Sequence, residues 1–193
     1  FIYGQKHEKE IQSSKEIAEH YSVEEHKLLE IPLNEISVSS LFKDEGEIPS
    51  HEEKRIGRSI PSTYVPARNI ILLSYALSYA ESVGAEAIYI GANAIDYSGY
   101  PDCRPEFYEA FKDMAKKGTK TGVEGNPIDI RYPLINMSKS DIVKKAYGIG
   151  VPLEKTWSCY KGGKKACGVC DACKLRLKGF KEADLEDPLE YEN

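Results

Sequence analysis

The alternation of apolar and polar positions divides the middle of the chain into helices and strands. An uninterrupted apolar run at 87–90 predicts a strand of the kind found in parallel sheets, and a second strand is expected at 128–132. Apolar residues lie nearly all round the helix expected over 66–83, which we therefore expect to be buried on several sides. Amphipathic spacing predicts another helix over 105–116. Strands and helices in alternation imply an α/β fold with a doubly wound parallel sheet.

The segments on either side of this central part give more local signals. Residues 1–4 read as the end of a strand, a helix is expected over 7–21, and a short strand over 27–31 stops at a proline. Residues 37–59 are acidic, aperiodic and punctuated by glycine and proline, which indicates a mobile loop. A helix over 138–146 begins at a serine with an aspartate three residues later, an approximate capping box.

Length and composition are those of an ordinary globular protein. The chain has 193 residues, enough for one domain with a small appendage, and 41% of them are hydrophobic and 30% charged. No apolar run approaches the roughly 18 residues that span a bilayer. The longest run, 70–80, lacks the position and flanks of a signal peptide. These features predict a cytoplasmic protein without a membrane partner.

Four of the five cysteines crowd into fifteen residues, which suits a metal site better than a secreted disulfide framework. They are Cys159, Cys167, Cys170 and Cys173. This Cys-x7-Cys-x2-Cys-x2-Cys spacing can bring four sulfurs to one point, as tetrahedral zinc requires. Gly168 suits a turn with positive φ, and a helix over 171–180 would place Cys173 in its first turn. With every position filled by protein, the zinc would be structural; a four-cysteine iron–sulfur cluster is the alternative.

The charge of the chain is uneven, although its net value of −5 favours no nucleic-acid partner. Residues 155–181 hold eight lysines or arginines against one acid, Asp171. This segment is either a solvated surface with local compensation or a face for phosphate or nucleic acid, and the sequence leaves both open.

Polar side chains crowd the loop that follows the strand expected at 87–90. Ligands of open α/β sheets bind beyond the carboxyl ends of the strands. Asp96 and Asp102 could accept hydrogen bonds from a guanine-like edge, and Arg104 could hold a carboxylate or phosphate. The composition fits an ordinary turn-rich loop equally well. Cys103 has no base near it in sequence, so a free and partly buried thiol is expected rather than a nucleophile.

Several motifs, in collinear order, carry a resemblance that no one of them carries alone. They are Tyr3-Gly4-Gln5-Lys6-His7, Val65-Pro66-Ala67-Arg68-Asn69, Gly91-Ala92-Asn93, Arg104-Pro105-Glu106-Phe107, Ser138-Lys139-Ser140-Asp141 and the four-cysteine tail. Together they closely resemble the 7-cyano-7-deazaguanine synthase family of the queuosine pathway. The resemblance covers nearly the whole chain.

The resemblance implies a fold and a reaction. The fold is the adenine-nucleotide α-hydrolase-like sheet of ATP pyrophosphatases, expected over 1–153 and usually in a homodimer, with a zinc-binding segment over 154–193. In the reaction ATP, with Mg²⁺, activates 7-carboxy-7-deazaguanine, and ammonia converts the adenylate to an amide. A second ATP helps to dehydrate the amide to the nitrile. AMP and pyrophosphate are released, and nucleic acid is not required.

The same resemblance implies residues for each ligand. Those for the deazaguanine are Arg68, Asn69, Asn93, Asp96, Ser98, Tyr100, Asp102 and Arg104, and those for the nucleotide are Gln5, His7, Gly91 and Lys139. Lys139 is also the expected catalytic residue, because a lysine in the first turn of a helix opposes the helix dipole unless an anion binds there. Lys139 could instead be an exposed lysine, Arg68 could pair with a structural acid, and His7 could be a solvated histidine.

One signature of the family does not occur in these 193 residues. The pyrophosphate loop, Ser-Gly-Gly-x-Asp-Ser, is expected ahead of Phe1 in a strand-and-helix unit of roughly thirty residues. Two alternative functions therefore stay open. One is a related ATP-using enzyme that joins a deazaguanine to nucleic acid or protein, which the basic segment would suit. The other is a zinc-stabilised binding module without catalysis, which the missing loop would permit.

Overall fold

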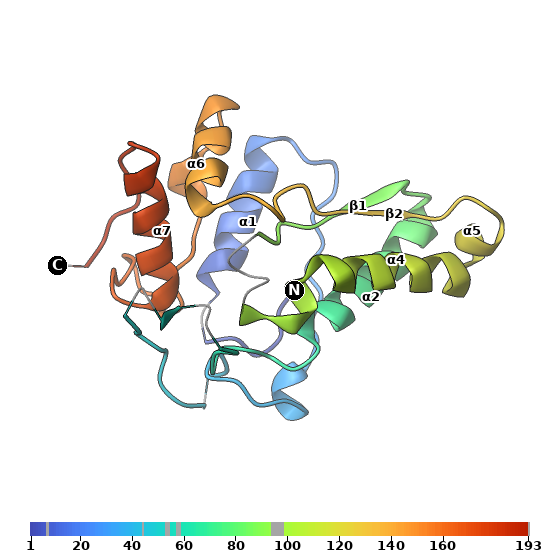
Figure 1. Cartoon of the computed structure of the whole chain (residues 1–193), viewed down its shortest axis with the longest axis horizontal. Helices are drawn as coiled ribbons and strands as arrows, with labels where there is room; N and C mark the ends of the chain where they lie inside the picture. The colour runs from blue at the N-terminus through green and yellow to red at the C-terminus, as the bar shows by residue number, and fades with distance from the viewer. Residues whose placement is uncertain (7, 44, 53–54, 57–58, 94–98, 193) are drawn as a thin grey trace. The chain divides into compact units, whose positions relative to one another are not determined.

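The computed structural model describes residues 1–6, 8–43, 45–52, 55–56, 59–93 and 99–192, which Figure 1 draws in colour. These residues form two compact units, and each is described by itself. Unit 1 comprises Phe1–Ile56, Pro61–Pro66 and Ser138–Asn193, and unit 2 comprises Gly57–Ile60 and Ala67–Met137. The domain boundary expected between residues 153 and 154 stays a prediction. Among the described helices, none is both long enough and apolar enough to cross a membrane.

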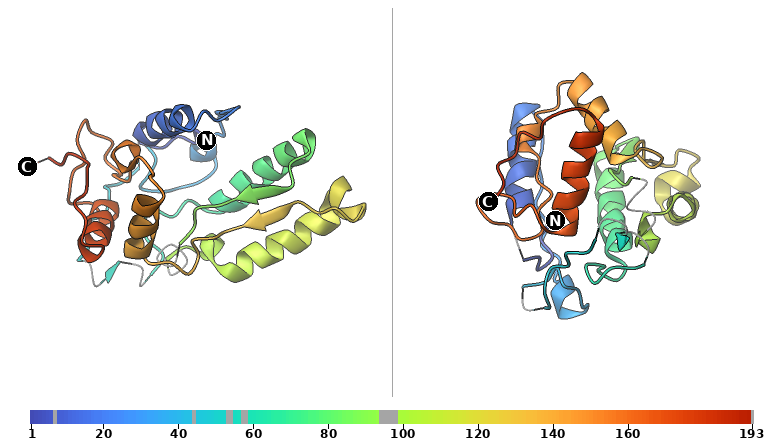
Figure 2. Two further views of the ribbon diagram at one scale, coloured as in Figure 1. Left: turned by 90° about the horizontal axis from the view of Figure 1, so that it is seen from above. Right: turned by 60° about the vertical axis from the view of Figure 1, so that its left-hand side comes forward.

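Unit 2 is built around a parallel sheet of two described strands. Strands β1 (Ala87–Tyr89) and β2 (Asp129–Arg131) are hydrogen-bonded in parallel. Helices α2 (Arg68–Val83) and α4 (Pro105–Gly118) run alongside the strands, as the left view of Figure 2 shows. Shorter elements are the 3-10 turn η3 (Pro101–Cys103) and the helix α5 (Lys120–Val123).

One hydrophobic cluster holds unit 2 together. Its members are Leu73, Leu77, Ala80, Ala92, Tyr108, Phe111, Ala115, Ile128, Ile130 and Ile135. Complete burial of an aliphatic or aromatic side chain contributes about 1.5–3 kcal/mol, so this cluster is the main source of stability in the unit. It joins α2 and α4 to β2 and thereby fixes where the loop after β1 begins.

Helix α2 is buried on one face, so the expectation of burial on several sides is wrong. Leu73, Leu77 and Ala80 are buried at helical spacing. Ile70 and Tyr75, on the rest of the helix, are 43% and 45% exposed. The apolar content of a helix does not show how many neighbours it has, and the cluster of unit 2 covers only one side of this one.

Unit 1 combines residues from the beginning and the end of the chain. Its helices are α1 (Lys9–His20), α6 (Lys139–Gly148) and α7 (Asp171–Glu182), with 3-10 turns η1 (Leu33–Glu35) and η4 (Leu153–Lys155). The strands expected at 1–4 and 27–31 meet in an isolated parallel bridge between Ile2 and Glu30. Parallel pairing is thus present in both units, and the chain is α/β with a parallel sheet, as predicted.

Helix α6 begins at the capping box that the sequence predicts. Ser138 Oγ accepts a hydrogen bond from Asp141 N at 3.2 Å, and Asp141 Oδ2 accepts one from Ser138 N at 3.0 Å. Val143, one turn further on, packs against Phe180 and Ala183 at the end of α7. The first turn of α6 is therefore fixed both by its cap and by its contact with α7.

Candidate metal centre and substrate loop

The four clustered cysteines meet in the C-terminal part of unit 1. Their sulfurs all lie within 4.8 Å of one another, and Cys167 Sγ is 4.0 Å from Cys173 Sγ. Four sulfurs at about 2.3 Å from one zinc ion lie about 3.8 Å apart, so small movements would close these four on one ion. A cluster of several iron atoms would hold its sulfurs further apart. The site can hold a single metal ion, and its donors are consistent with zinc.

Hydrogen bonds to sulfur prepare this site for a cation. Lys161 N and Cys167 N each lie 3.4 Å from Cys159 Sγ, and Cys170 N lies 3.4 Å from Cys167 Sγ. Hydrogen bonds from the Cys170 and Cys173 side chains lower the pKa of Cys159, whereas those with Cys159 and Cys170 raise the pKa of Cys173. The thiols therefore compete for negative charge, and a divalent ion removes that competition by favouring all four thiolates.

Local backbone geometry brings the last three ligands together. Gly168 has a φ of +69°, the left-handed conformation that the Cys-Gly-Val-Cys turn was expected to need. Cys170 is the N-cap of α7 and Cys173 lies in the first turn of the helix. The amide dipoles of that turn favour thiolates, so the start of α7 is part of the metal site.

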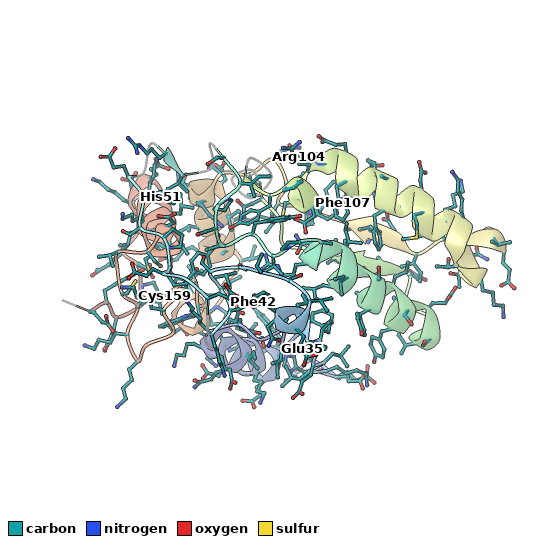
Figure 3. All side chains as sticks on the ribbon, turned by 90° about the horizontal axis from the view of Figure 1, so that it is seen from below. Glu35, Phe42, His51, Arg104, Phe107 and Cys159 are labelled. Carbon is teal, nitrogen blue, oxygen red and sulfur yellow. The ribbon has the colours of Figure 1, made fainter. Side chains whose placement is uncertain are left out.

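Residues 48–51 are fastened to the start of α7. Asp171 accepts a hydrogen bond from the His51 amide at 2.6 Å, and its other oxygen lies 2.7 Å from His51 Nδ1. Lys174 Nζ donates to the carbonyl oxygen of His51 at 2.7 Å. Figure 3 labels His51 and Cys159, which both belong to unit 1. Part of the loop expected to be mobile is thus held against the metal site.

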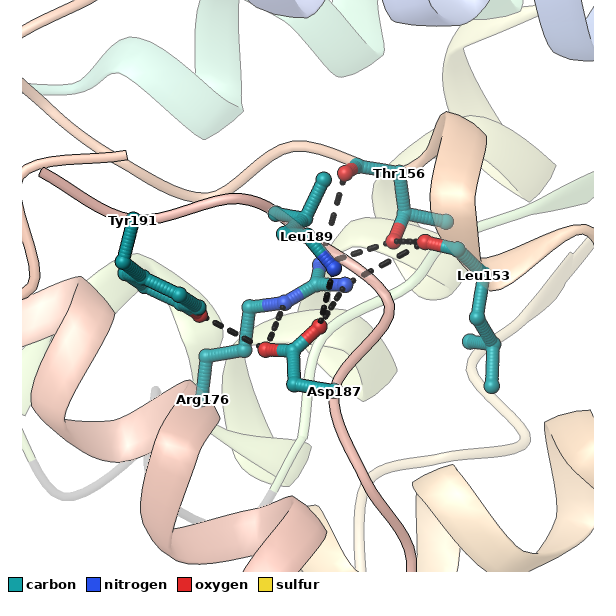
Figure 4. Close-up of polar contacts among 6 residues, drawn as sticks. All are labelled: Leu153, Thr156, Arg176, Asp187, Leu189 and Tyr191. Atoms are coloured by element: carbon teal, nitrogen blue, oxygen red, sulfur yellow. Dashed lines mark hydrogen bonds and ion pairs between the residues drawn. The ribbon is translucent and has the colours of Figure 1, made fainter. Parts of the chain in front are cut away.

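A buried ion pair connects α7 to the C-terminal tail. Arg176 donates from Nε to Asp187 Oδ2 at 2.7 Å and from Nη2 to Asp187 Oδ1 at 2.9 Å. Figure 4 shows that Arg176 also reaches Thr156 and Leu153. The Tyr191 hydroxyl donates to Asp187 at 2.6 Å. Burial raises the pKa of Asp187, but the hydrogen bonds from Arg176 and Tyr191 outweigh burial and hold that pKa below its usual value.

The same tail pairs with the loop between the first two cysteine ligands. Ala166 N donates to Glu190 O at 2.9 Å, and Glu192 N donates to Ala166 O at 2.8 Å. Lys165 Nζ lies 3.1 Å from the carboxylate of Glu190. Some of the basic residues of 155–181 therefore have acidic partners in the tail, in line with local compensation of charge.

In unit 2, the end of the loop after β1 is fastened to the start of α2. Asp102 Oδ2 accepts a hydrogen bond from the Asn69 amide at 2.9 Å. Asn69 Nδ2 donates to Asp102 O at 3.2 Å and to Cys103 Sγ at 3.0 Å. Asp102 thus accepts a hydrogen bond from the backbone N–H of Asn69, which lies in the first turn of α2 and has no acceptor inside the helix. Cys103 is buried and is not part of a disulfide.

The other residues expected to bind the deazaguanine differ in exposure. Arg68 is half-buried in the first turn of α2, and Arg104 is exposed just before α4, where Figure 3 labels it together with Phe107. Asn93 is buried and Tyr100 is half-buried. Expected site residues that lie outside the described part of the chain are His7, Asp96 and Ser98.

The residues expected to bind the nucleotide are divided between the units. In unit 1, Gln5 is buried, accepts a hydrogen bond from Tyr3 N at 2.7 Å and lines a cavity of about 300 Å³. Lys139 is half-buried in the first turn of α6. In unit 2, Gly91 is exposed close to the end of β1. The approach of these residues to one ATP molecule stays a prediction.

Two sets of contacts in unit 1 were not predicted from the sequence. Asp171 and Arg176 lie on α7 close to the ligands Cys170 and Cys173, and the structure shows that both are buried. Their closeness in sequence to the cysteines was the signal that could have singled them out. Their partners were not readable, because His51 is 120 residues from Asp171 and Asp187 lies in a tail that looks solvated.

Together these features define an α/β protein with a parallel sheet and a four-cysteine metal centre. The model of one protein family, described as "Queuosine biosynthesis protein QueC", matches residues 1–184. The chain belongs to this QueC family.

Individual relatives are similar over almost the whole chain. The 7-cyano-7-deazaguanine synthase of Acetivibrio thermocellus is 53% identical over 191 residues, which are 99% of this chain and 84% of the relative. The synthase of Thermoplasma acidophilum is 54% identical over 192 residues, 100% of this chain and 79% of the relative. That of Nostoc punctiforme is 48% identical over 192 residues, 99% and 86% of the two chains. The resemblance inferred from the motifs is confirmed.

Proposed function

We propose that this protein converts 7-carboxy-7-deazaguanine and ammonia to 7-cyano-7-deazaguanine at the expense of ATP. The observation that carries the proposal is the match of the QueC family model to residues 1–184. Relatives about half identical to the chain, and named for this synthase, support the same reaction.

The proposed chemistry consists of two activations. The substrate carboxylate attacks the α-phosphorus of ATP, and pyrophosphate leaves. Ammonia then attacks the acyl adenylate, AMP leaves with the carboxylate oxygen, and a proton is lost to give the amide. The amide oxygen attacks a second ATP in the same way, and loss of AMP and of the nitrogen protons gives the nitrile. Adenylation is needed because hydroxide and oxide are poor leaving groups, whereas AMP is a good one.

We assign the substrate to the loop after β1 and to the start of α2. Arg68 and Arg104 would hold the carboxylate, because a guanidinium matches a carboxylate with two hydrogen bonds. Asn93, Tyr100 and, outside the described residues, Asp96 and Ser98 would surround the deazaguanine. Asn69 and Asp102, which are bonded to each other, would hold that loop against α2.

Lys139 is assigned to the ATP phosphates, with Gln5, His7 and Gly91 also near the nucleotide. Lys139 lies at the N-terminus of α6, where the helix dipole and a nearby cation would both favour a phosphate. Mg²⁺ would accompany the nucleotide. The four cysteines would hold one structural zinc, which leaves no coordination position for substrate or water.

The protein is further proposed to act as a homodimer in the cytoplasm. The names of the relatives favour the synthase reaction over transfer of a deazaguanine to nucleic acid or protein, and over a binding module without catalysis.

The proposal is tested by product analysis with the full-length protein. It should form the nitrile from 7-carboxy-7-deazaguanine, ATP, Mg²⁺ and ¹⁵N-ammonium, with one ¹⁵N in the product by mass spectrometry. AMP and pyrophosphate should appear, and omission of ammonium should stop the reaction before the amide. Release of ADP and phosphate would contradict adenylation, and no nitrile would contradict the function.

A further inference from the structure

Gly179, inside α7, lies directly against the first residue of α6. A Cβ atom built on Gly179 would be 2.9 Å from Lys139 Cβ and 3.3 Å from the Lys139 carbonyl carbon. Such short separations cannot be relieved by rotating a side chain, since both contacted atoms belong to the backbone or adjoin it. Glycine is unfavourable in a helix interior, so the close approach accounts for its presence here.

The same helix begins in the metal site. Cys170 is the N-cap of α7 and Cys173 lies in its first turn. Gly179 follows Cys173 by six residues, a distance of about 9 Å along the helix axis. A helix this short behaves as a rigid body, so an ion that fixes the sulfurs at one end fixes the position of Gly179 at the other.

Further contacts keep α6 in register with α7. Phe180 and Ala183 of the α7 end pack against Val143 of α6 in one buried cluster. On the same helix, Arg176 is anchored to Asp187 and to the carbonyl oxygen of Leu153. The first turn of α6 therefore rests on a helix whose own position is set from several directions.

We propose that the metal centre positions Lys139 through α7, and that Gly179 is the positioning residue that permits it. The role of Lys139 itself rests on the function proposed above. In this proposal zinc would act without touching the substrate, by fixing the helix against which Lys139 and the N-terminus of α6 are packed. Gly179 acts on catalysis only through Lys139.

The first test compares glycine variants of the full-length, zinc-loaded protein. Gly179→Ala should slow pyrophosphate release about tenfold to a hundredfold, since a displacement near 1 Å at a reacting group has an effect of that size. The KM for the deazaguanine should stay the same. Gly148→Ala is the matched control, because a Cβ at Gly148 meets nothing within 4 Å. It should retain the parent rate.

A double-mutant cycle separates positioning from general damage. Once Lys139 is replaced by alanine, adding Gly179→Ala should slow pyrophosphate release no further, whereas any loss of thermal stability should persist. Equal slowing by Gly179→Ala with and without Lys139 would overturn the proposal. A parent protein that releases no pyrophosphate would contradict the proposed function and not this inference.

The second test needs no catalysis. Removal of zinc by a chelator should accelerate amide hydrogen exchange at Ile142 and Val143 of α6 at least about tenfold, together with exchange over 159–173. Exchange in α4 of unit 2 serves as the internal control and should not change. Unchanged exchange at Ile142 and Val143, while 159–173 exchanges freely, would show that the metal does not set the position of α6.

Discussion

Arg176 and Asp187 form a two-bond ion pair whose side chains are only 9% and 4% exposed. Replacement of Asp187 by alanine would leave a buried cation without its carboxylate. We expect the free energy of unfolding to fall by about 3–5 kcal/mol. Urea unfolding followed by circular dichroism, with parent and variant side by side, measures the difference.

An exposed pair on the same helix supplies the control. Lys178 and Glu182 lie 3.8 Å apart, with side chains 47% and 51% exposed. Glu182→Ala should therefore reduce the free energy of unfolding by at most about 1 kcal/mol. If Glu182→Ala and Asp187→Ala lowered the free energy of unfolding by similar amounts, breaking the buried Arg176–Asp187 pair would cost no more than breaking an exposed one.

The pKa of Asp187 makes stability depend on pH in a defined direction. Its value in the folded protein is below the usual one, while in the unfolded chain an aspartate titrates near about 3.9. The ion pair contributes fully to the free energy of unfolding when the pH is above the pKa of Asp187 in the unfolded chain. This contribution is lost as the pH falls through the lower pKa of Asp187 in the folded protein. The stability difference between parent and Asp187→Asn should be constant from about pH 7 to 5 and shrink below about pH 4. A difference that persists undiminished at lower pH would contradict this assignment.

Zinc content tests the cysteine site directly. The purified protein should contain one zinc per chain by elemental analysis. Cys170→Ser should lose the metal and unfold the segment around it, because metal binding and folding are one process at such sites. Cys103→Ser, which changes the buried thiol of unit 2, should keep its zinc. Zinc well below one per chain in the parent would exclude the site.

The contact between Asn69 and Asp102 predicts that a mutation of Asp102 changes the KM for one substrate and not for the other. Asp102→Ala removes the acceptor of the Asn69 amide, which should reduce the free energy of unfolding by about 1 kcal/mol, as for other helix caps. It should also raise the KM for the deazaguanine while the KM for ATP stays the same. Asp113→Ala, at an exposed position of α4, is the control in steady-state kinetics. Equal changes in both KM values would argue against a role in the substrate loop.

Lys139 can be tested by the rate of adenylation. Loss of a transition-state contact to phosphate costs about 2–4 kcal/mol, so Lys139→Ala should slow pyrophosphate release about 30- to 900-fold at saturating substrates. Lys145→Ala, in the last turn of the same helix, should have no effect. A rate for Lys139→Ala within about threefold of the parent would identify Lys139 as a surface lysine.

Features with a local cause were predictable from the sequence. The capping box of α6 depends on two residues three apart, and the metal site on cysteines within one short segment. Strand β1 was predicted from an apolar run and β2 from a short segment with apolar residues at alternate positions. The burial of β1 was not predictable, because its residues are half-buried or exposed, and Tyr89 is 65% exposed.

Contacts between distant segments were not predictable. The attachment of His51 to Asp171 joins residues 120 positions apart and leaves no periodic signal in either segment. The one-sided burial of α2 depends on how many elements meet it, which its own apolar residues do not reveal. For the same reason the hydrogen bond between Asn69 and Asp102, two residues predicted to bind the substrate, was not predicted.

The acidic C-terminal tail is structurally part of the metal centre, so truncations and C-terminal tags are expected to affect that centre. Residues 187–192 supply the carboxylate for Arg176 and two backbone hydrogen bonds for Ala166, beside the ligand Cys167. Deleting them would act as a mutation of the zinc site rather than as removal of a loose end. Lys164 and Lys165 are exposed in the loop that pairs with the tail. Faster cleavage by trypsin at these two lysines would therefore report that the tail has come away from the metal site.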